Sequence, residues 1–160
     1  MTPLAPRLLE AARARGATIA TAESCTGGMV AAAITDVAGS SDVFDRGFVT
    51  YSNAAKRAML GVRAETLDAH GAVSEPVARE MAEGALARSD AALAVSTTGI
   101  AGPGGSAHKP EGRVCFALAR RDGPTATETV EFGALGRDAV RRASVDHALR
   151  LLIGALQPPA

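Results

Sequence analysis

Residues 99–112 read GIAGPGGSAHKPEG and lie between two apolar runs, 91–96 and 113–119. Five glycines and two prolines make this segment unable to form a helix. Parallel neighbouring strands need a structured crossover of about a dozen residues or more, so the strand at 113–119 is predicted to run antiparallel to the strand at 91–96. The turn at 121–124 then reverses the chain again, into a strand at 126–132.

The rest of the chain adds two strands, 17–22 and 46–51, and several helices. The predicted helices span 3–14, 26–35, 53–60, a segment that opens at 74–76, and 136–156. The last helix is expected to bury Val140, Ala143, His147 or Ala148, Leu151 and Leu152. The predicted fold is α/β, a three-layer α/β/α sandwich on a mixed five-stranded sheet of order 2-1-3-4-5 with strand 4 antiparallel. Residues 1–160 are assigned to a single domain with a disordered tail, 157–160.

Composition excludes several classes of function. Seventeen basic and seventeen acidic residues give a formal net charge of zero, which argues against the basic stripe of a nucleic-acid-binding protein. Aromatic residues make up only 3% of the chain, so base-stacking platforms are not expected. The sequence shows no apolar run of membrane-spanning length and no signal-peptide pattern. Two cysteines are too few for a disulfide framework or a zinc site, and a cytoplasmic setting is expected.

The predicted topology indicates where a ligand would bind. Ligands of open α/β sheets bind outside the carboxyl ends of the parallel strands. Because strand 4 is reversed, the segment that leads into it reaches the same edge. The polar or glycine-rich segments predicted to meet there are 23–28, 51–56, 97–105, 109–112 and 133–141. We therefore expect the functional site at this edge of the sheet.

The segment ESCTGG at 23–28 places two hydroxyls, a thiol and two glycines at a strand-to-helix turn. Glycines let the backbone approach a ligand closely, and the free N–H groups of a helix start attract an anion. Ser24 is therefore a candidate nucleophile or phosphate ligand. The alternative is an ordinary helix cap, for which one hydroxyl suffices.

A serine nucleophile needs a base. None of the three histidines, His70, His108 and His147, lies in a nucleophile–base motif. A desolvated lysine can serve, because burial lowers its pKa towards neutrality. Lys56 and Lys109 are the only lysines and both fall on the predicted edge, although each alone would be an ordinary surface residue. The residues themselves leave the choice between the two open.

Other polar groups on this edge suit an anionic substrate. The segment 97–105 offers backbone N–H groups and the Thr98 hydroxyl, or is simply a flexible loop. Arg137 and Arg141 lie one helical turn apart and can hold a phosphate together, or decorate a solvated helix face. Tyr51, the only tyrosine, can stack on a ring or donate a hydrogen bond. The chain shows no metal-ligand spacing, so no metal is expected.

These features resemble the CinA C-terminal domain family, the competence/damage-inducible proteins, from about residue 15 to about residue 155. The motifs that carry the resemblance are AESCTGG at 22–28, GSS at 39–41, GFVTYSN at 47–53 with Lys56, HGAVS at 70–74, TGIAGP at 98–103, Lys109-Pro110 with Gly112, and Arg137 with Arg141. Glu111 stands where the family's Lys-Pro-x-Gly motif usually has a small apolar residue. Longer members carry an N-terminal domain, and this chain is expected to be the stand-alone form.

The resemblance implies hydrolysis of the carboxamide of nicotinamide mononucleotide (NMN) to nicotinate mononucleotide and ammonia, with no cofactor. Ser24 would be the nucleophile and Lys56 its base, with Tyr51 and Thr98 assisting. The implied substrate-binding residues are Glu23, Cys25, Thr26, Gly27, Gly28, Asn53, Gly99, Gly102, Lys109, Arg137 and Arg141. The implied partner is this small nucleotide, and a homo-oligomer, a dimer, is expected.

Two other functions are weighed against the amidohydrolase. A non-catalytic module that binds a nucleotide or phosphate would share the fold but would not need a desolvated Lys56. An accessory protein of DNA transactions is suggested only by the family's name. The zero net charge disfavours this second alternative.

Overall fold

The computed structural model describes residues 2–158. Its centre is a five-stranded sheet of order β2-β1-β3-β4-β5. The strands are β1 (Ile19–Glu23), β2 (Phe44–Val49), β3 (Leu93–Gly99), β4 (Arg113–Arg120) and β5 (Gly123–Glu131). β1 pairs in parallel with β2 and β3, whereas β4 is antiparallel to both β3 and β5. The predicted strand order and the antiparallel fourth strand are confirmed.

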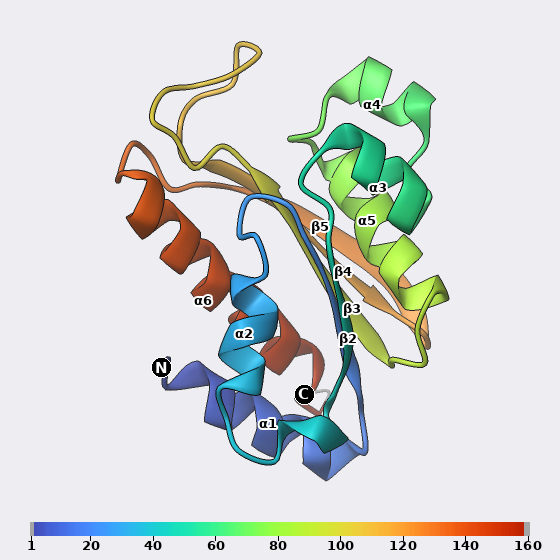
Figure 1. Cartoon of the computed structure of the whole chain (residues 1–160). Coiled ribbons are helices and arrows are strands. Elements are labelled where there is room, and N and C mark those ends of the chain that lie inside the picture. Colours follow the sequence, from blue (N-terminus) through green and yellow to red (C-terminus); the bar gives the residue numbers. More distant parts are fainter. Residues whose placement is uncertain (1, 159–160) are drawn as a thin grey trace.

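Helices cover both faces of the sheet, which confirms the predicted three layers (Figure 1). One face carries α1 (Leu4–Arg15), α2 (Met29–Thr35) and α6 (Arg137–Ala155), and the other carries α3 (Asn53–Leu60), α4 (Ala64–His70) and α5 (Glu75–Ala87). A short 3₁₀ turn, Ser40–Asp42, leads into β2. None of the helices in residues 2–158 has the length and apolar content that crossing a bilayer requires.

Two apolar clusters hold the layers together. Leu8, Phe116 and Leu149 are fully buried between the sheet and the helices α1, α2 and α6. On the other face, Val77 and Met81 of α5 pack on small side chains of the central strands. All five residues of β1 are buried, as expected of a strand covered on both faces. The central strands are therefore a rigid support for the loops at their ends.

Element boundaries differ from the predictions by up to three residues, and the difference at α2 matters most. The helix predicted at 26–35 begins only at Met29. Gly27 (φ +57°) and Gly28 (φ +103°) adopt left-handed conformations that keep residues 26–28 in a turn. The hydroxyls and the thiol that follow β1 therefore lie in a loop, ahead of the helix.

Three further expectations need correction or fall outside the structure. Within α6, Ala148 rather than His147 is buried, and Ser144 and Val145 are buried where Ala143 and Leu151 were expected. Helix α4 was not predicted. Of the tail 157–160, residues 157–158 have no regular secondary structure, and the prediction for 159–160 lies outside the described residues.

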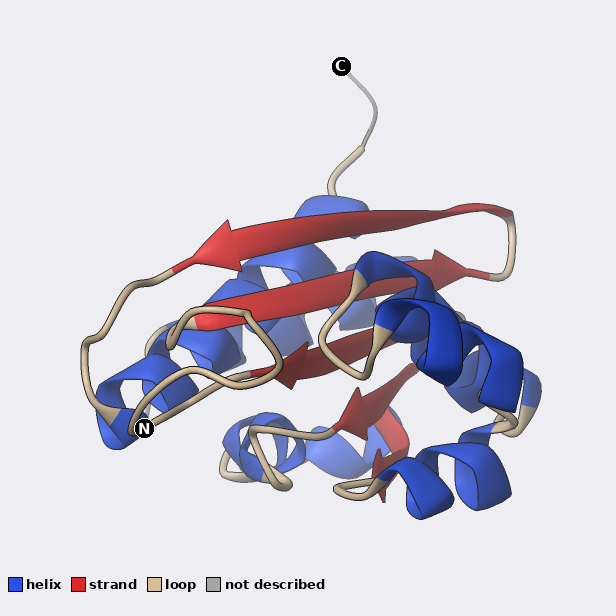
Figure 2. Cartoon of the chain, turned by 90° about the horizontal axis from the view of Figure 1, so that it is seen from above, coloured by secondary structure: helices blue, strands red, loops and turns tan. Residues whose placement is uncertain are grey.

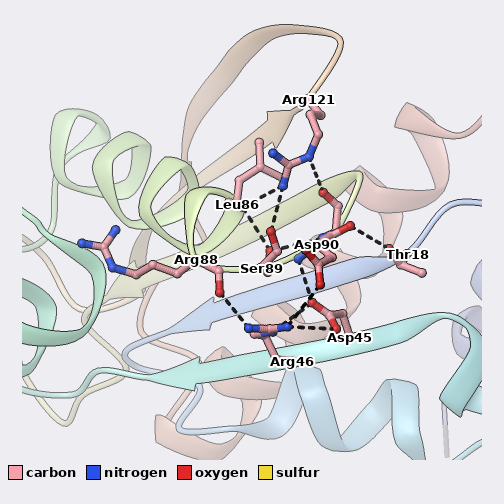
Figure 3. A network of polar contacts seen from close by, with 9 residues as sticks. Thr18, Asp45, Arg46, Leu86, Arg88, Ser89, Asp90 and Arg121 are labelled. Carbon is pink, nitrogen blue, oxygen red and sulfur yellow. Dashed lines mark hydrogen bonds and ion pairs between the residues drawn. The ribbon is translucent and has the colours of Figure 1, made fainter.

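A polar network closes the end of the sheet at which the parallel strands begin (Figure 3). Arg121 donates to the carbonyls of Leu86 (2.8 Å) in the last turn of α5, and of Ser89 (3.1 Å) and Ala91 (2.9 Å) after it. Asp45 on β2 accepts the N–H of Asp90 at 3.1 Å. These contacts tie the α5–β3 connection to the edge strand β2 and to the β4–β5 turn, so this end serves the stability of the fold.

Candidate active site

A cavity of about 400 Å³ opens at the opposite end, where β1 and β3 finish. Figure 2 views the molecule from this end, onto the loops that follow the strands. The cavity is lined by the turn after β1, the segment from β2 into α3, residues 71–73, the loop 98–109 and the start of α6. The predicted site residues that line it are Ser24, Cys25, Tyr51, Asn53, Lys56, Thr98, Gly99, Gly102, Lys109 and Arg137.

Ser24 and Lys56 form a buried hydroxyl–amine pair in this cavity. Ser24 follows β1 directly, and its N–H donates to the carbonyl of Thr97 on β3 at 2.9 Å. Lys56 projects from α3, whose first turn is capped by the Ser52 hydroxyl. Lys56 Nζ lies 3.0 Å from Ser24 Oγ. Ser24 is 8% exposed and Lys56 only 1% exposed, so bulk water competes little for either group.

The surroundings of Lys56 favour the neutral amine. Burial lowers the pKa of Lys56 below its ordinary value, and the weaker influence of the Cys25 thiol opposes this shift. The other partners of Nζ are the carbonyls of Thr50 (3.1 Å) and Tyr51 (3.2 Å). A neutral amine has two N–H donors, and two carbonyls accept them. In the structure Nζ donates to Ser24 Oγ, and the Ser24 hydroxyl donates to the carbonyl of Tyr51 at 3.4 Å. Loss of a proton from Nζ leaves a lone pair beside the Ser24 hydroxyl, which is what a general base requires.

Lys109 also lines the cavity but is engaged differently. Its Nζ donates to the carbonyls of His70 at 2.8 Å and Val73 at 2.5 Å. Lys109 therefore fixes the segment before α5 against the loop 98–109. The geometry separates the two lysines that the sequence left open, because the amine paired with Ser24 is that of Lys56.

Tyr51 and Arg137 meet at the cavity mouth. The Arg137 guanidinium donates to the Tyr51 hydroxyl at 2.9 Å and to the carbonyl of Gly102 at 2.7 Å. Deeper in the cavity, the hydroxyl of the buried Thr98 donates to the carbonyl of Ala72 at 2.9 Å. Arg137 thus connects three cavity walls and carries a positive charge that a phosphate could reach.

The loop over the cavity is held at its base by Glu111. One of its carboxylate oxygens accepts the N–H of Gly104 at 2.6 Å. Gly102 has a left-handed backbone (φ +96°), and a Cβ there would overlap the Glu111 side chain. Glu111 therefore lies against the glycine-rich part of the loop and limits its movement.

The residues that line the cavity do not include Glu23, Thr26, Gly27 or Gly28, which were expected to contact a substrate. The Glu23 carboxylate turns back into the start of α2 and is 1% exposed. The first N–H groups of α2 are therefore already occupied by an anion of the protein itself. The predicted anion site at this helix start is not available.

Arg141 is also absent from the cavity lining, so the predicted arginine pair is divided. Its Nε donates to the carbonyl of Cys25 at 3.1 Å, and its Nη2 to that of Thr26 at 3.4 Å. A Cβ on Gly27 would lie 3.2 Å from Nη2, which leaves little room for any other residue there. Arg137 points to the cavity, whereas Arg141 clamps the turn that carries Ser24.

Cys25 lines the cavity next to Ser24 but is a poor nucleophile. Burial raises the pKa of its thiol to about 11. The thiolate is the reactive form of cysteine, so Cys25 stays protonated and unreactive near neutral pH. Of the two neighbours, Ser24 is the residue whose side chain bonds the Lys56 amine.

Residues 71–73 line the cavity, although the secondary-structure pattern gave no sign of their position. Because α4 was missed, the path of the chain between α3 and α5 could not be followed. Their only signal was the motif HGAVS at 70–74, which carries part of the family resemblance.

The sequence is similar to known proteins along nearly its whole length. The model of the CinA C-terminal domain family matches residues 1–156. The nicotinamide-nucleotide amidohydrolase PncC of Escherichia coli K12 is 58% identical over 150 residues, covering 93% of this chain and 90% of that protein. A putative competence-damage inducible protein of Symbiobacterium thermophilum is 57% identical over an alignment 155 positions long, which covers 89% of this chain and 36% of that protein.

Solved structures agree with this similarity. A competence/damage inducible protein from Agrobacterium tumefaciens superposes with a TM-score of 0.93 at 52% identity, covering 96% of this chain and 94% of the other. A competence damage-inducible protein A from Klebsiella pneumoniae gives a TM-score of 0.92 at 43% identity, covering 96% and 94%. The sandwich and its cavity therefore lie on a fold already seen in crystals.

Proposed function

The chain belongs to the CinA C-terminal domain family, and from this membership we propose that it is a nicotinamide-nucleotide amidohydrolase. It hydrolyses the carboxamide of NMN to nicotinate mononucleotide and ammonia. Relatives that are 57% and 58% identical to it over the aligned residues carry this activity in their names. The observation that carries the mechanism is the buried Ser24–Lys56 pair, with 3.0 Å between Oγ and Nζ, on the wall of the cavity.

In the first half-reaction, Ser24 Oγ attacks the carboxamide carbon while Lys56 Nζ takes the hydroxyl proton. The tetrahedral intermediate collapses as Lys56 returns this proton to the leaving nitrogen, which departs as ammonia. The nicotinoyl group is left as an ester on Ser24. The fit of a neutral amine to this step follows from its low exposure and its two carbonyl partners.

In the second half-reaction, water attacks the ester carbon and gives a proton to Lys56. Lys56 then protonates Ser24 Oγ as the ester bond breaks, which releases nicotinate mononucleotide and restores the starting state. Each half-reaction moves one proton through the same amine. The chemistry therefore needs no second titrating residue at the cavity.

The developing oxyanion needs donors other than the start of α2, where Glu23 occupies the N–H groups. We assign this role to the N–H of Cys25, which directly follows the nucleophile, as in other serine hydrolases. Arg137 is assigned to the 5′-phosphate. It stands at the start of the nineteen-residue helix α6, where the helix dipole also favours an anion.

Three further expectations are part of this proposal. They are a homodimer, a cytoplasmic reaction and a single domain over residues 1–160. Light scattering coupled to size-exclusion chromatography tests the first, and limited proteolysis tests the last. Cell fractionation tests the compartment.

The deciding experiment measures ammonia and nicotinate mononucleotide released from NMN after chelation of metal ions. The wild type is expected to be active, and Ser24→Ala and Lys56→Ala are expected to be inactive. Arg121→Ala, in the network at the far end of the sheet, is the matched control and should keep its activity. NMN binding without turnover by the folded wild type would contradict the proposal and support a non-catalytic module.

A further inference from the structure

We propose that Glu23 is a positioning residue that fixes the nucleophile by binding the start of α2 with its own carboxylate. The inference rests on the proposed role of Ser24 and adds a residue that lies outside the cavity. Glu23 immediately precedes Ser24, and its side chain binds the segment that immediately follows it. The turn that presents the hydroxyl is therefore held from both sides.

The Glu23 carboxylate has a complete set of partners. Oε1 accepts the Thr26 hydroxyl at 2.6 Å and the N–H groups of Gly28 at 3.2 Å and Val30 at 2.9 Å. Oε2 accepts the N–H of Ala31 at 3.0 Å. Because Glu23 is only 1% exposed, these hydrogen bonds form away from water, where they are strong. Every donor belongs to residues 26–31.

A second set of bonds ties the same turn to β3. The Thr26 and Thr97 hydroxyls lie 2.8 Å apart, and the carbonyl of Thr97 accepts the N–H of Ser24 at 2.9 Å. Thr97 thus contacts the turn at Ser24 itself and at Thr26. Through Thr26, the Glu23 carboxylate stabilises this link between β1, β3 and α2.

A local cap could not do the same work. The N-cap residue of α2 is Gly28, which has no side chain to offer the helix. A serine or threonine at that position would bond the first turn of the helix but would leave β1 unconnected to it. Glu23 is in β1 itself, so its bonds fix the position of the helix relative to the strand. A nucleophile displaced by about 1 Å can lose about 10²-fold in rate.

Two substitutions of Glu23 remove different numbers of these hydrogen bonds. Glu23→Gln can keep its carbonyl oxygen at the Oε1 position and so keeps three of the four bonds, whereas Glu23→Ala keeps none. We expect kcat for NMN to fall about 10²-fold in Glu23→Ala and only a few-fold in Glu23→Gln, with KM unchanged in both. The matched control is Asp45→Ala, which removes a carboxylate that bonds Arg46 and Asp90 at the other end of β2 (Figure 3).

Asp45→Ala should lower stability and leave kcat unchanged. The inference is overturned if both Glu23 variants keep the wild-type kcat and only lose stability, as Asp45→Ala does. It is equally overturned if KM rises at constant kcat, because Glu23 would then contact the substrate. If Glu23→Ala does not fold, the kcat and KM of Glu23→Gln are judged by the same two criteria.

A readout that is independent of turnover separates this inference from the proposed function. A wild type that releases no ammonia from NMN would contradict the function alone. Amide hydrogen exchange over residues 24–31 would still test Glu23. Faster exchange confined to this segment in Glu23→Ala supports the positioning role, and unchanged exchange refutes it.

Discussion

Replacing Lys56 with methionine should abolish activity and change how stability depends on pH. The methionine side chain keeps the apolar stem of Lys56 and removes the amine. A general base contributes about 10² to 10⁴-fold to a rate, so kcat for NMN should fall by at least that factor. The amine bonds Ser24 Oγ and the carbonyls of Thr50 and Tyr51. At about 1 kcal/mol each, their loss should cost about 2–3 kcal/mol at high pH, where Lys56 is neutral in both states.

The cost should shrink as the pH falls. Burial lowers the pKa of Lys56 in the folded protein below the ordinary value of 10.5. Below 10.5 the unfolded chain binds a proton that the folded protein does not, so the wild type loses stability as the pH falls towards the lowered pKa. A tenfold change in the acid dissociation constant corresponds to about 1.4 kcal/mol. Lys56→Met has no amine at this position, so its stability does not fall in this way. The free energies of unfolding of the wild type and the variant should therefore converge as the pH falls, and they can cross.

Urea unfolding of both proteins across this pH range measures the difference between their free energies of unfolding. The other titrating groups are the same in both proteins, so their contributions cancel in this difference. Lys109→Met is the control for the loss of a lysine as such. The reasoning is refuted if the gap widens as the pH falls, because Lys56 would then be stabilised as a cation. In the wild type, kcat/KM should rise with pH through the same lowered pKa, since the reaction needs the neutral amine.

The other predictions concern binding and stability. Arg137→Ala should raise KM for NMN by about 10- to 100-fold, because a charge-assisted hydrogen bond is worth about 1.5–3 kcal/mol, and should have no such effect on the nucleoside that lacks the phosphate. Arg121→Ala should lower the free energy of unfolding by about 1–2 kcal/mol in urea, since it loses bonds to three carbonyls that are partly open to water. Gly84→Ala should cost about 1–3 kcal/mol in the same measurement, since overpacking strains a core. The new Cβ would lie 2.9 Å from the carbonyl carbon of Leu60.

The sequence was sufficient to predict the sheet and the edge of the sheet at which the cavity lies. The segment 99–112 excludes a crossover helix, and this alone required the antiparallel β4 that the structure shows. Helix α4 was missed for a physical reason. Its N-cap residue, Arg63, makes no capping bond with its side chain, and the helix start is bound by Glu80 of α5, which accepts from Arg63 N–H and the Thr66 hydroxyl. A cap supplied by another helix leaves no local signal.

In the candidate site too, positions that depend on the local sequence were predictable, and contacts between distant segments were not. The position of Lys56 followed from its place after β2. The contacts of Glu23 and Arg141 did not follow from the sequence, because both side chains bind backbone groups and neither lines the cavity. Arg141 reaches carbonyls more than a hundred residues away in the chain. No spacing rule predicts such a contact before the layers are packed.

The distribution of lysines has a consequence for chemical labelling. Lys56 and Lys109 are the only lysines among seventeen basic residues, and both line the cavity. Amine-directed acylating reagents will therefore find side-chain amines only at the cavity, where Lys109 is partly exposed and Lys56 is buried, because the other side chains counted as basic are arginines. A small reagent will report on access to the cavity, and a bound nucleotide will protect against it. Because arginine stands at every other position counted as basic, a general amine reagent that modifies side chains probes one place on this protein, and the α-amino group is its one other amine target.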